Sequence, residues 1–131
     1  MNKDGEPPWS EAANLRLFSG VELVFSSTGR WLHPLFELEE FMKTAGLQPA
    51  SLRLEDKIVG KAAAMLMLRM GFRTVHGATM SRLARDFFDR HGARYTYDRL
   101  VERIDCQTEA LLADVDDLEH AYELLAERAK K

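Results

Sequence analysis

The sequence has one cysteine and no long apolar run, and each shortage excludes a class of protein. A single cysteine among 131 residues cannot form an internal disulfide, which fits a chain kept in a reducing cytosol. The longest apolar run, from Ala62 to Leu68, is far too short to cross a bilayer. The first residues are charged and proline-rich and lack the apolar core of a signal peptide. We therefore expect a cytoplasmic protein with no membrane partner.

The chain also lacks a surplus of basic over acidic residues. The chain has 18 Lys and Arg against 21 Asp and Glu, a net charge of −3. Because there is no basic surplus to neutralise a phosphate backbone, we do not expect nucleic acid as a partner. The length suits one domain that buries its own core. We expect a flexible N-terminus over residues 1–10 and a single domain over residues 11–131.

The first half of the chain predicts a hairpin followed by two helices. Two short apolar runs on either side of Ser19-Gly20 favour a β-hairpin over residues 15–25. Pro34 then begins a helix that ends at Gly46. The next predicted helix, from Lys57 to Met70, is apolar on nearly every side. A helix of this kind is typical of a buried central position.

The second half alternates strands and helices. We predict strands over residues 73–76 and 93–97, and between them a helix that Ser81 caps. A short helix over residues 107–112 and a final helix over residues 116–130 follow. Strands that alternate with helices indicate an α/β domain in which helices pack on the faces of a central mixed sheet.

Several segments resemble a known family. They are Thr28-Gly-Arg-Trp-Leu-His-Pro-Leu35, Asp56-Lys-Ile-Val-Gly-Lys-Ala-Ala-Ala64, Cys106 with Glu109, and Asp114-Val-Asp-Asp-Leu-Glu-His-Ala-Tyr122. Over roughly residues 14–125 the chain is similar to the bacterial "domain of unknown function 1893" family. The resemblance implies a three-layer, cytidine-deaminase-like fold and assigns no activity. Trp31 stands where a glycine is common in that family.

The zinc chemistry of the deaminases is not expected here. It needs a histidine or cysteine and a glutamate at one helix start, and a Pro-Cys-x-x-Cys pattern at the next. The matching segments of this chain are Asp56-Lys-Ile-Val-Gly-Lys61 and Ala78-Thr-Met-Ser81, which lack those ligands. We expect no metal site and no cofactor.

The start of the central helix is the first candidate site. Lys57 and Lys61 would share one helix face near the N-terminus, where backbone N–H groups and the helix dipole favour anions. Gly60 would let a ligand approach closely. Ser81 at the next helix start and His76 at a strand end complete the candidate ligand-binding set. We therefore expect a small anionic or nucleotide-like ligand.

Other interpretations of the same residues stay open. Asp56 could cap the central helix while the lysines reach solvent or pair with Glu55. Cys106 lies at a predicted helix start, which lowers a thiol pKa, so a thiol enzyme that uses Cys106 as its catalytic residue is one alternative. A small, partly buried cysteine is the plainer reading. Whether the protein is an enzyme stays open.

A non-catalytic scaffold that interacts with other proteins is a further alternative. Aromatic residues are enriched at protein interfaces, and Trp9, Trp31 and Phe36 could be the anchors of a homo-oligomer.

Overall fold

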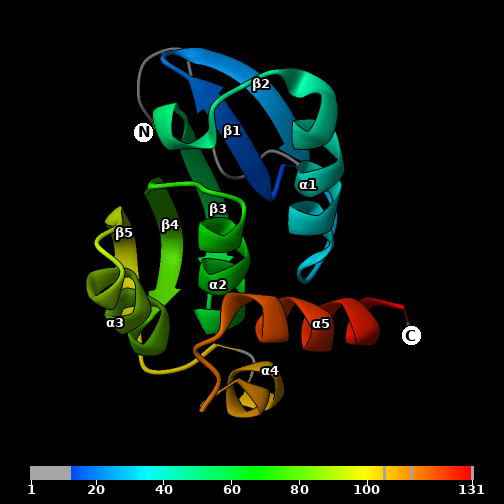
Figure 1. Ribbon diagram of the computed structural model, residues 1–131. Helices are drawn as coiled ribbons and strands as arrows, with labels where there is room; N and C mark the ends of the chain where they lie inside the picture. The colour runs from blue at the N-terminus through cyan, green and yellow to red at the C-terminus, as the bar shows by residue number, and fades with distance from the viewer. Residues whose placement is uncertain (1–12, 105, 113, 131) are drawn as a thin grey trace.

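The computed structural model describes residues 13–104, 106–112 and 114–130, and these form a mixed five-stranded sheet with helices packed against it (Figure 1). The strands are β1 (Leu15–Ser19), β2 (Glu22–Ser27), β3 (Arg53–Val59), β4 (Thr74–Ser81) and β5 (Arg94–Val101). The helices are α1 (His33–Ala45), the short 3₁₀ helix η1 (Pro49–Ser51), α2 (Lys61–Arg69), α3 (Arg82–Arg90), α4 (Cys106–Leu111) and α5 (Leu118–Ala129).

The strand order across the sheet is β2-β1-β3-β4-β5. β1 runs antiparallel to both β2 and β3, whereas β3, β4 and β5 are parallel to one another. The predicted hairpin is confirmed as β1 and β2, and Gly20 takes a φ of +61° in its turn. The prediction of an α/β domain with a mixed sheet is therefore confirmed.

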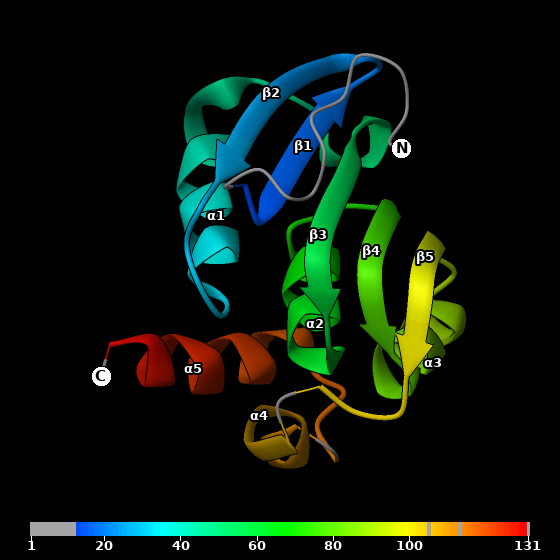
Figure 2. The same cartoon turned by 180° about the vertical axis from the view of Figure 1, so that it is seen from behind.

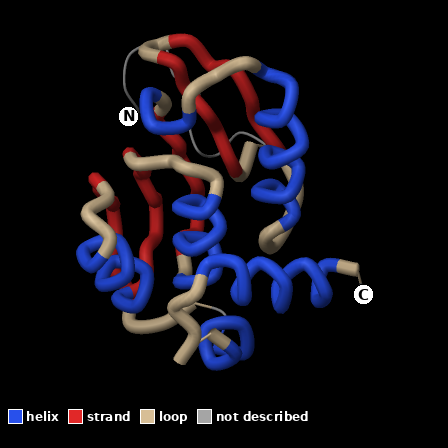
Figure 3. Tube along the Cα trace, viewed as in Figure 1, coloured by secondary structure: helices blue, strands red, loops and turns tan. Residues whose placement is uncertain are grey.

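The helices are gathered on one side of the sheet. Seen from the front and from behind, α1, α2, α3 and α5 lie on the same face, and α4 lies next to the end of β3 (Figures 1 and 2). The expected three-layer arrangement, with helices on both faces, is not what the described residues form. The tube in Figure 3 shows the same separation, with the strands behind the helices.

Helix α2 is the centre of the core, as its composition predicts. Every residue from Lys61 to Leu68 is buried. Its neighbours are α5, α3, α1, α4 and strand β3. A helix surrounded in this way has no solvent face to supply with polar side chains, which explains its alanines, leucines and methionines.

The predicted start of that helix is wrong. Residues 57–59 belong to β3, and Gly60 is the N-cap residue of α2. Lys57 and Lys61 therefore do not share a helix face, and Asp56 does not cap the helix. The physical reason is tertiary: β3 hydrogen-bonds to β1 on one side and to β4 on the other. Those two ladders outweigh the local helical pattern.

The predicted cap of α3 and the predicted end of α2 are confirmed. The Ser81 side chain accepts a hydrogen bond from the Ala84 N–H at 3.1 Å and caps α3. Gly71 follows α2 with a φ of +100°, the left-handed conformation common after helices. Asp117 caps α5 by accepting from Glu119 and His120, although α5 begins later than predicted.

The tight packing of β3 against β4 gives a test of the fold. A Cβ at Gly77 would lie 2.9 Å from Val59 Cγ2. We expect Gly77→Ala to lower the free energy of unfolding by about 1–3 kcal/mol, measured by urea denaturation. Val59→Ala removes the obstructing methyl group. Gly77→Ala should therefore lower the free energy of unfolding by less in a Val59→Ala background than in the wild type. Equal losses in the two backgrounds would contradict the packing described.

Candidate functional site

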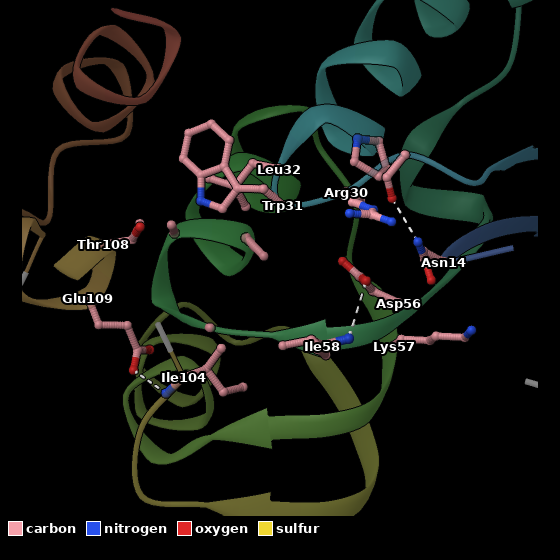
Figure 4. Close-up of a pocket in the computed structure, with 15 residues that line it drawn as sticks. Asn14, Arg30, Trp31, Leu32, Asp56, Lys57, Ile58, Ile104, Thr108 and Glu109 are labelled. Atoms are coloured by element: carbon pink, nitrogen blue, oxygen red, sulfur yellow. Dashed lines mark hydrogen bonds between the residues drawn. The ribbon is translucent and has the colours of Figure 1, made fainter. Parts of the chain in front are cut away.

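A pocket of about 380 Å³ lies at the carboxyl end of β3 (Figure 4). Its walls come from four segments: the residue before β1, the loop from β2 to α1, the junction of β3 with α2, and α4 with the residues before it. The polar residues that line it are Asn14, Arg30, Asp56, Lys57, Thr108 and Glu109. The carboxyl end of a parallel strand is where open α/β sheets place their ligands.

Asp56 is the carboxylate in this pocket. Its Oδ1 accepts a hydrogen bond from the Ile58 N–H at 3.3 Å, and the backbone of Lys57 also donates to the carboxyl group. Burial raises the pKa of Asp56 from 3.8 to about 7, and hydrogen bonds from the backbone of Ile58 and Lys57 oppose part of that rise. The side chain therefore changes charge near neutral pH.

The loop from β2 to α1 is fastened to the start of β1. Asn14 Nδ2 donates to the Gly29 carbonyl at 2.7 Å and to the Thr28 carbonyl at 3.2 Å. These bonds fix the loop that carries Arg30 and Trp31 into the pocket wall. The described residues contain no side-chain hydrogen bond or ion pair to the Arg30 guanidinium, which is exposed to solvent.

Trp31 has an unusual backbone conformation. Its φ is +57°, and it is the one non-glycine residue with positive φ in the described part of the chain. The left-handed conformation costs a residue with a side chain roughly 1–2 kcal/mol. The indole lines the pocket and is 39% exposed.

Glu109 closes the inner end of the pocket. One carboxylate oxygen, Oε2, accepts from the Lys61 backbone N–H at 2.8 Å and from the Ser81 hydroxyl at 2.7 Å. The other, Oε1, accepts from the Ile104 N–H at 2.9 Å. The N-terminus of α2 thus already holds an anion, and that anion is a side chain of the same protein.

Lys61 does not point into the pocket. Its ammonium group donates to the Leu112 carbonyl at 2.9 Å and lies 3.3 Å from Asp116 Oδ1. The side chain is 4% exposed. The hydrogen bond and charge of Lys61 lower the pKa of Asp116 below its usual value, and the charge of Arg90 adds to this effect. Lys61 therefore joins α2 to the segment between α4 and α5.

Comparisons with known proteins place the chain in a family. The family model described as "Domain of unknown function (DUF1893)" matches residues 16–129. The chain belongs to this family. The crystal structure of a DUF1893 family protein (TM1506) from Thermotoga maritima at 2.70 Å resolution is similar, with a TM-score of 0.77 and 25% identity over 88% of this chain and 80% of that one. No curated protein matches the sequence significantly.

In this DUF1893 chain the residues predicted to bind a ligand do not form one site: two line the pocket, two lie behind Glu109, and His76 lies elsewhere. Lys57 and Gly60 line the pocket. Lys61 and Ser81 lie behind the Glu109 carboxylate and are engaged by internal contacts. A Cβ on Gly60 would lie 3.2 Å from Glu109 Oε2, so this glycine gives room to a side chain of the chain itself.

His76 lies apart from the pocket. Its Nδ1 is 2.6 Å from the Thr96 hydroxyl and its Nε2 is 3.3 Å from Asp98 Oδ2, both on the neighbouring strand β5. Because side chains alternate along a strand, His76 points to the face opposite its buried neighbour Val75. The backbone of Cys106 begins α4, and the prediction of a catalytic thiol concerns a side chain outside the described structure.

The sequence patterns did not identify the two carboxylates that shape this site. The sequence suggests Asp56 only as an alternative cap of the central helix, and Glu109 only as part of a segment that resembles the family. The alternation of Leu52 and Leu54, followed by the β-branched pair Ile58-Val59 and then Gly60, is a strand signal that places Asp56 within a strand.

Two further features bear on the kind of protein. None of the helices in the described ranges combines the length and the apolar character that a bilayer-spanning helix needs. Those ranges also contain no group of three or more His, Cys, Asp or Glu side chains that could hold a metal ion.

Glu109 gives a test of the closed helix end. Glu109→Gln keeps the shape but replaces one accepting oxygen with a donor, so a buried N–H or hydroxyl loses its partner. We expect the free energy of unfolding to fall by about 1–3 kcal/mol, measured by urea denaturation. Glu123→Gln on the exposed side of α5 is the matched control and should change it by less than about 0.5 kcal/mol. If Glu109→Gln leaves the free energy of unfolding unchanged, the hydrogen bonding described is contradicted.

Asp56 gives a pH-dependent test. Its pKa of about 7 in the folded state lies above the ordinary value of 3.8, so between these values the folded state binds more protons than the unfolded state. Stability is therefore lost as the pH rises through about 7. Relative to Asp56→Asn, the wild type should lose up to about 4 kcal/mol between pH 4 and pH 8. Parallel stability profiles for the two proteins in that window would contradict it, and Asp114→Asn serves as the exposed control.

Proposed function

We propose that this protein binds a small, nucleoside-sized organic molecule in the pocket at the carboxyl end of β3. The observation that carries the proposal is the Asp56 carboxyl group. It lies in an otherwise largely apolar pocket, and its hydrogen bonds within the described part of the chain come from the backbone of Ile58 and Lys57. A pocket of about 380 Å³ falls in the size range of small-molecule sites, in which a few polar groups orient the ligand.

The energetics of Asp56 support a functional role. At neutral pH an ionised carboxylate in this position makes the fold less stable, because burial disfavours its charge. An asparagine would keep the hydrogen bond to Ile58 and would not carry that penalty. Acidic groups held in unfavourable positions within pockets are typical of sites that bind or transform ligands.

Apolar side chains that are exposed at the pocket support the same proposal. Trp31 is 39% exposed and Ile58 is 56% exposed, and both line the pocket. Large apolar residues that stay in contact with water at a concave surface commonly mark a ligand site.

The proposal differs from an anion site at the start of the central helix. Glu109 already occupies the N-terminus of α2, and Lys61 is engaged by Leu112 and Asp116. Any anionic part of the ligand would therefore meet Arg30 at the pocket wall. The proposal includes no zinc-dependent deamination, because the starts of α2 and α3 carry no histidine or cysteine ligand.

A thermal-shift screen followed by calorimetric titration tests the proposal. The panel holds nucleobases, nucleosides, nucleoside monophosphates and sugar phosphates, at pH 6 and pH 8. We expect at least one member to raise the unfolding midpoint, because a ligand that binds only the folded state stabilises it. Asp56→Asn should weaken that binding at least tenfold.

Asp114→Asn, at an exposed position outside the pocket, is the control and should bind like the wild type. A panel without any stabilising member would defeat the proposal. Unchanged affinity in Asp56→Asn would instead place the bound ligand at another surface.

A further inference from the structure

The backbone of Trp31 is held in a conformation that its side chain does not favour. Its φ of +57° lies in the left-handed region, which glycine and asparagine adopt with little strain. A bulky residue in this region is a true outlier, and such outliers gather at ligand-binding sites.

The fold gains little from the indole in return. Trp31 is 39% exposed and is not part of the buried core. Its aromatic contact is an edge-on one with the exposed His33, at 5.6 Å between ring centroids. Core packing therefore does not explain a tryptophan at this position.

The position of the indole in the pocket does suggest a reason. In Figure 4 Trp31 extends from one side of the pocket, and Asp56 and Ile58 lie on the other. A flat ring inserted between Trp31 and these two residues would cover the face of the indole. It would also cover the Ile58 side chain, which is 56% exposed in this structure. The edge of the same ring would meet the Asp56 carboxyl group, which accepts hydrogen bonds.

We propose that Trp31 determines the specificity of the pocket by stacking on a planar heteroaromatic ring whose amino group donates to Asp56. The ligand class is thus an amino-substituted heterocycle of purine or pyrimidine size. This inference rests on the proposed function and narrows it, since that proposal requires only a small organic ligand. Many kinds of ring stack well on an aromatic side chain, so stacking on Trp31 discriminates little between them. The hydrogen bond to the Asp56 carboxyl group is what selects one ring over another.

Fluorescence titration tests the inference. The chain has two tryptophans, so the measurement uses a Trp9→Phe background in which Trp31 is the single emitter. The probes are adenosine, guanosine and cytidine, which carry an amino group, uridine, which does not, and ribose 5-phosphate, which has no ring. We expect at least one amino-bearing nucleoside to change Trp31 emission and to bind at least tenfold more tightly than uridine and ribose 5-phosphate.

Variants at position 31 separate stacking from folding. Trp31→Gly and Trp31→Asn suit the left-handed backbone, so their unfolding midpoints should equal or exceed that of the wild type. Both should bind the preferred nucleoside at least tenfold more weakly, and Trp31→Phe should stay within about threefold because it keeps a stacking face.

The two proposals fail in different ways. If the wild type binds ribose 5-phosphate as tightly as any nucleoside, or if Trp31→Gly binds a nucleoside with unchanged affinity, the inference about Trp31 is overturned while a ligand site remains. If no probe of the wider panel binds the wild type, the proposed function is overturned and the inference falls with it.

Discussion

The carboxylate of Glu109 is the contact on which the arrangement of this end of the molecule depends. It accepts hydrogen bonds from α2, from the N-cap serine of α3 and from the segment before α4. Hydrogen bonds to an ionised acceptor are roughly twice as strong as neutral ones, and a buried carboxylate needs them to offset its lost hydration. The three segments are distant in sequence, so this one group fixes how they meet.

Two consequences follow for the site. The positive end of the α2 dipole is neutralised internally, so it is not available to an outside anion. Glu109 also brings α4 across the carboxyl end of β3, where Thr108 and Ile104 become a wall of the pocket. The buried ammonium of Lys61 adds a second fastening to the segment after α4. The internal contacts of Glu109 and Lys61 thus hold in place the segments that form one wall of the pocket. The groups that face into the pocket come from β3 and from the β2–α1 loop.

Asp56 and Trp31 are the two places where this protein departs from what its own stability favours. One is a carboxyl group whose charge is disfavoured by burial, and the other is a bulky residue in a backbone conformation suited to glycine. Both line the same pocket. Sequences that fold well are locally consistent almost everywhere, and their exceptions concentrate at sites under selection for another property. The coincidence of two exceptions in one pocket is the reason to place function there.

The sequence by itself determined the elements whose signals are local. The glycine turn of the hairpin, the serine cap of α3, the glycine after α2 and the all-apolar centre of α2 were predictable because neighbouring residues alone decide them. The mixed α/β class and the family also followed from order and motif. Only the tertiary structure decided that residues 57–59 extend β3, because pairing with β4 and the hydrogen bond from the Lys57 N–H to the Asn14 carbonyl are contacts that no local pattern reveals. It alone brought Glu109 to the start of α2 and turned Lys61 away, since a buried charge takes the partner that the fold places within reach.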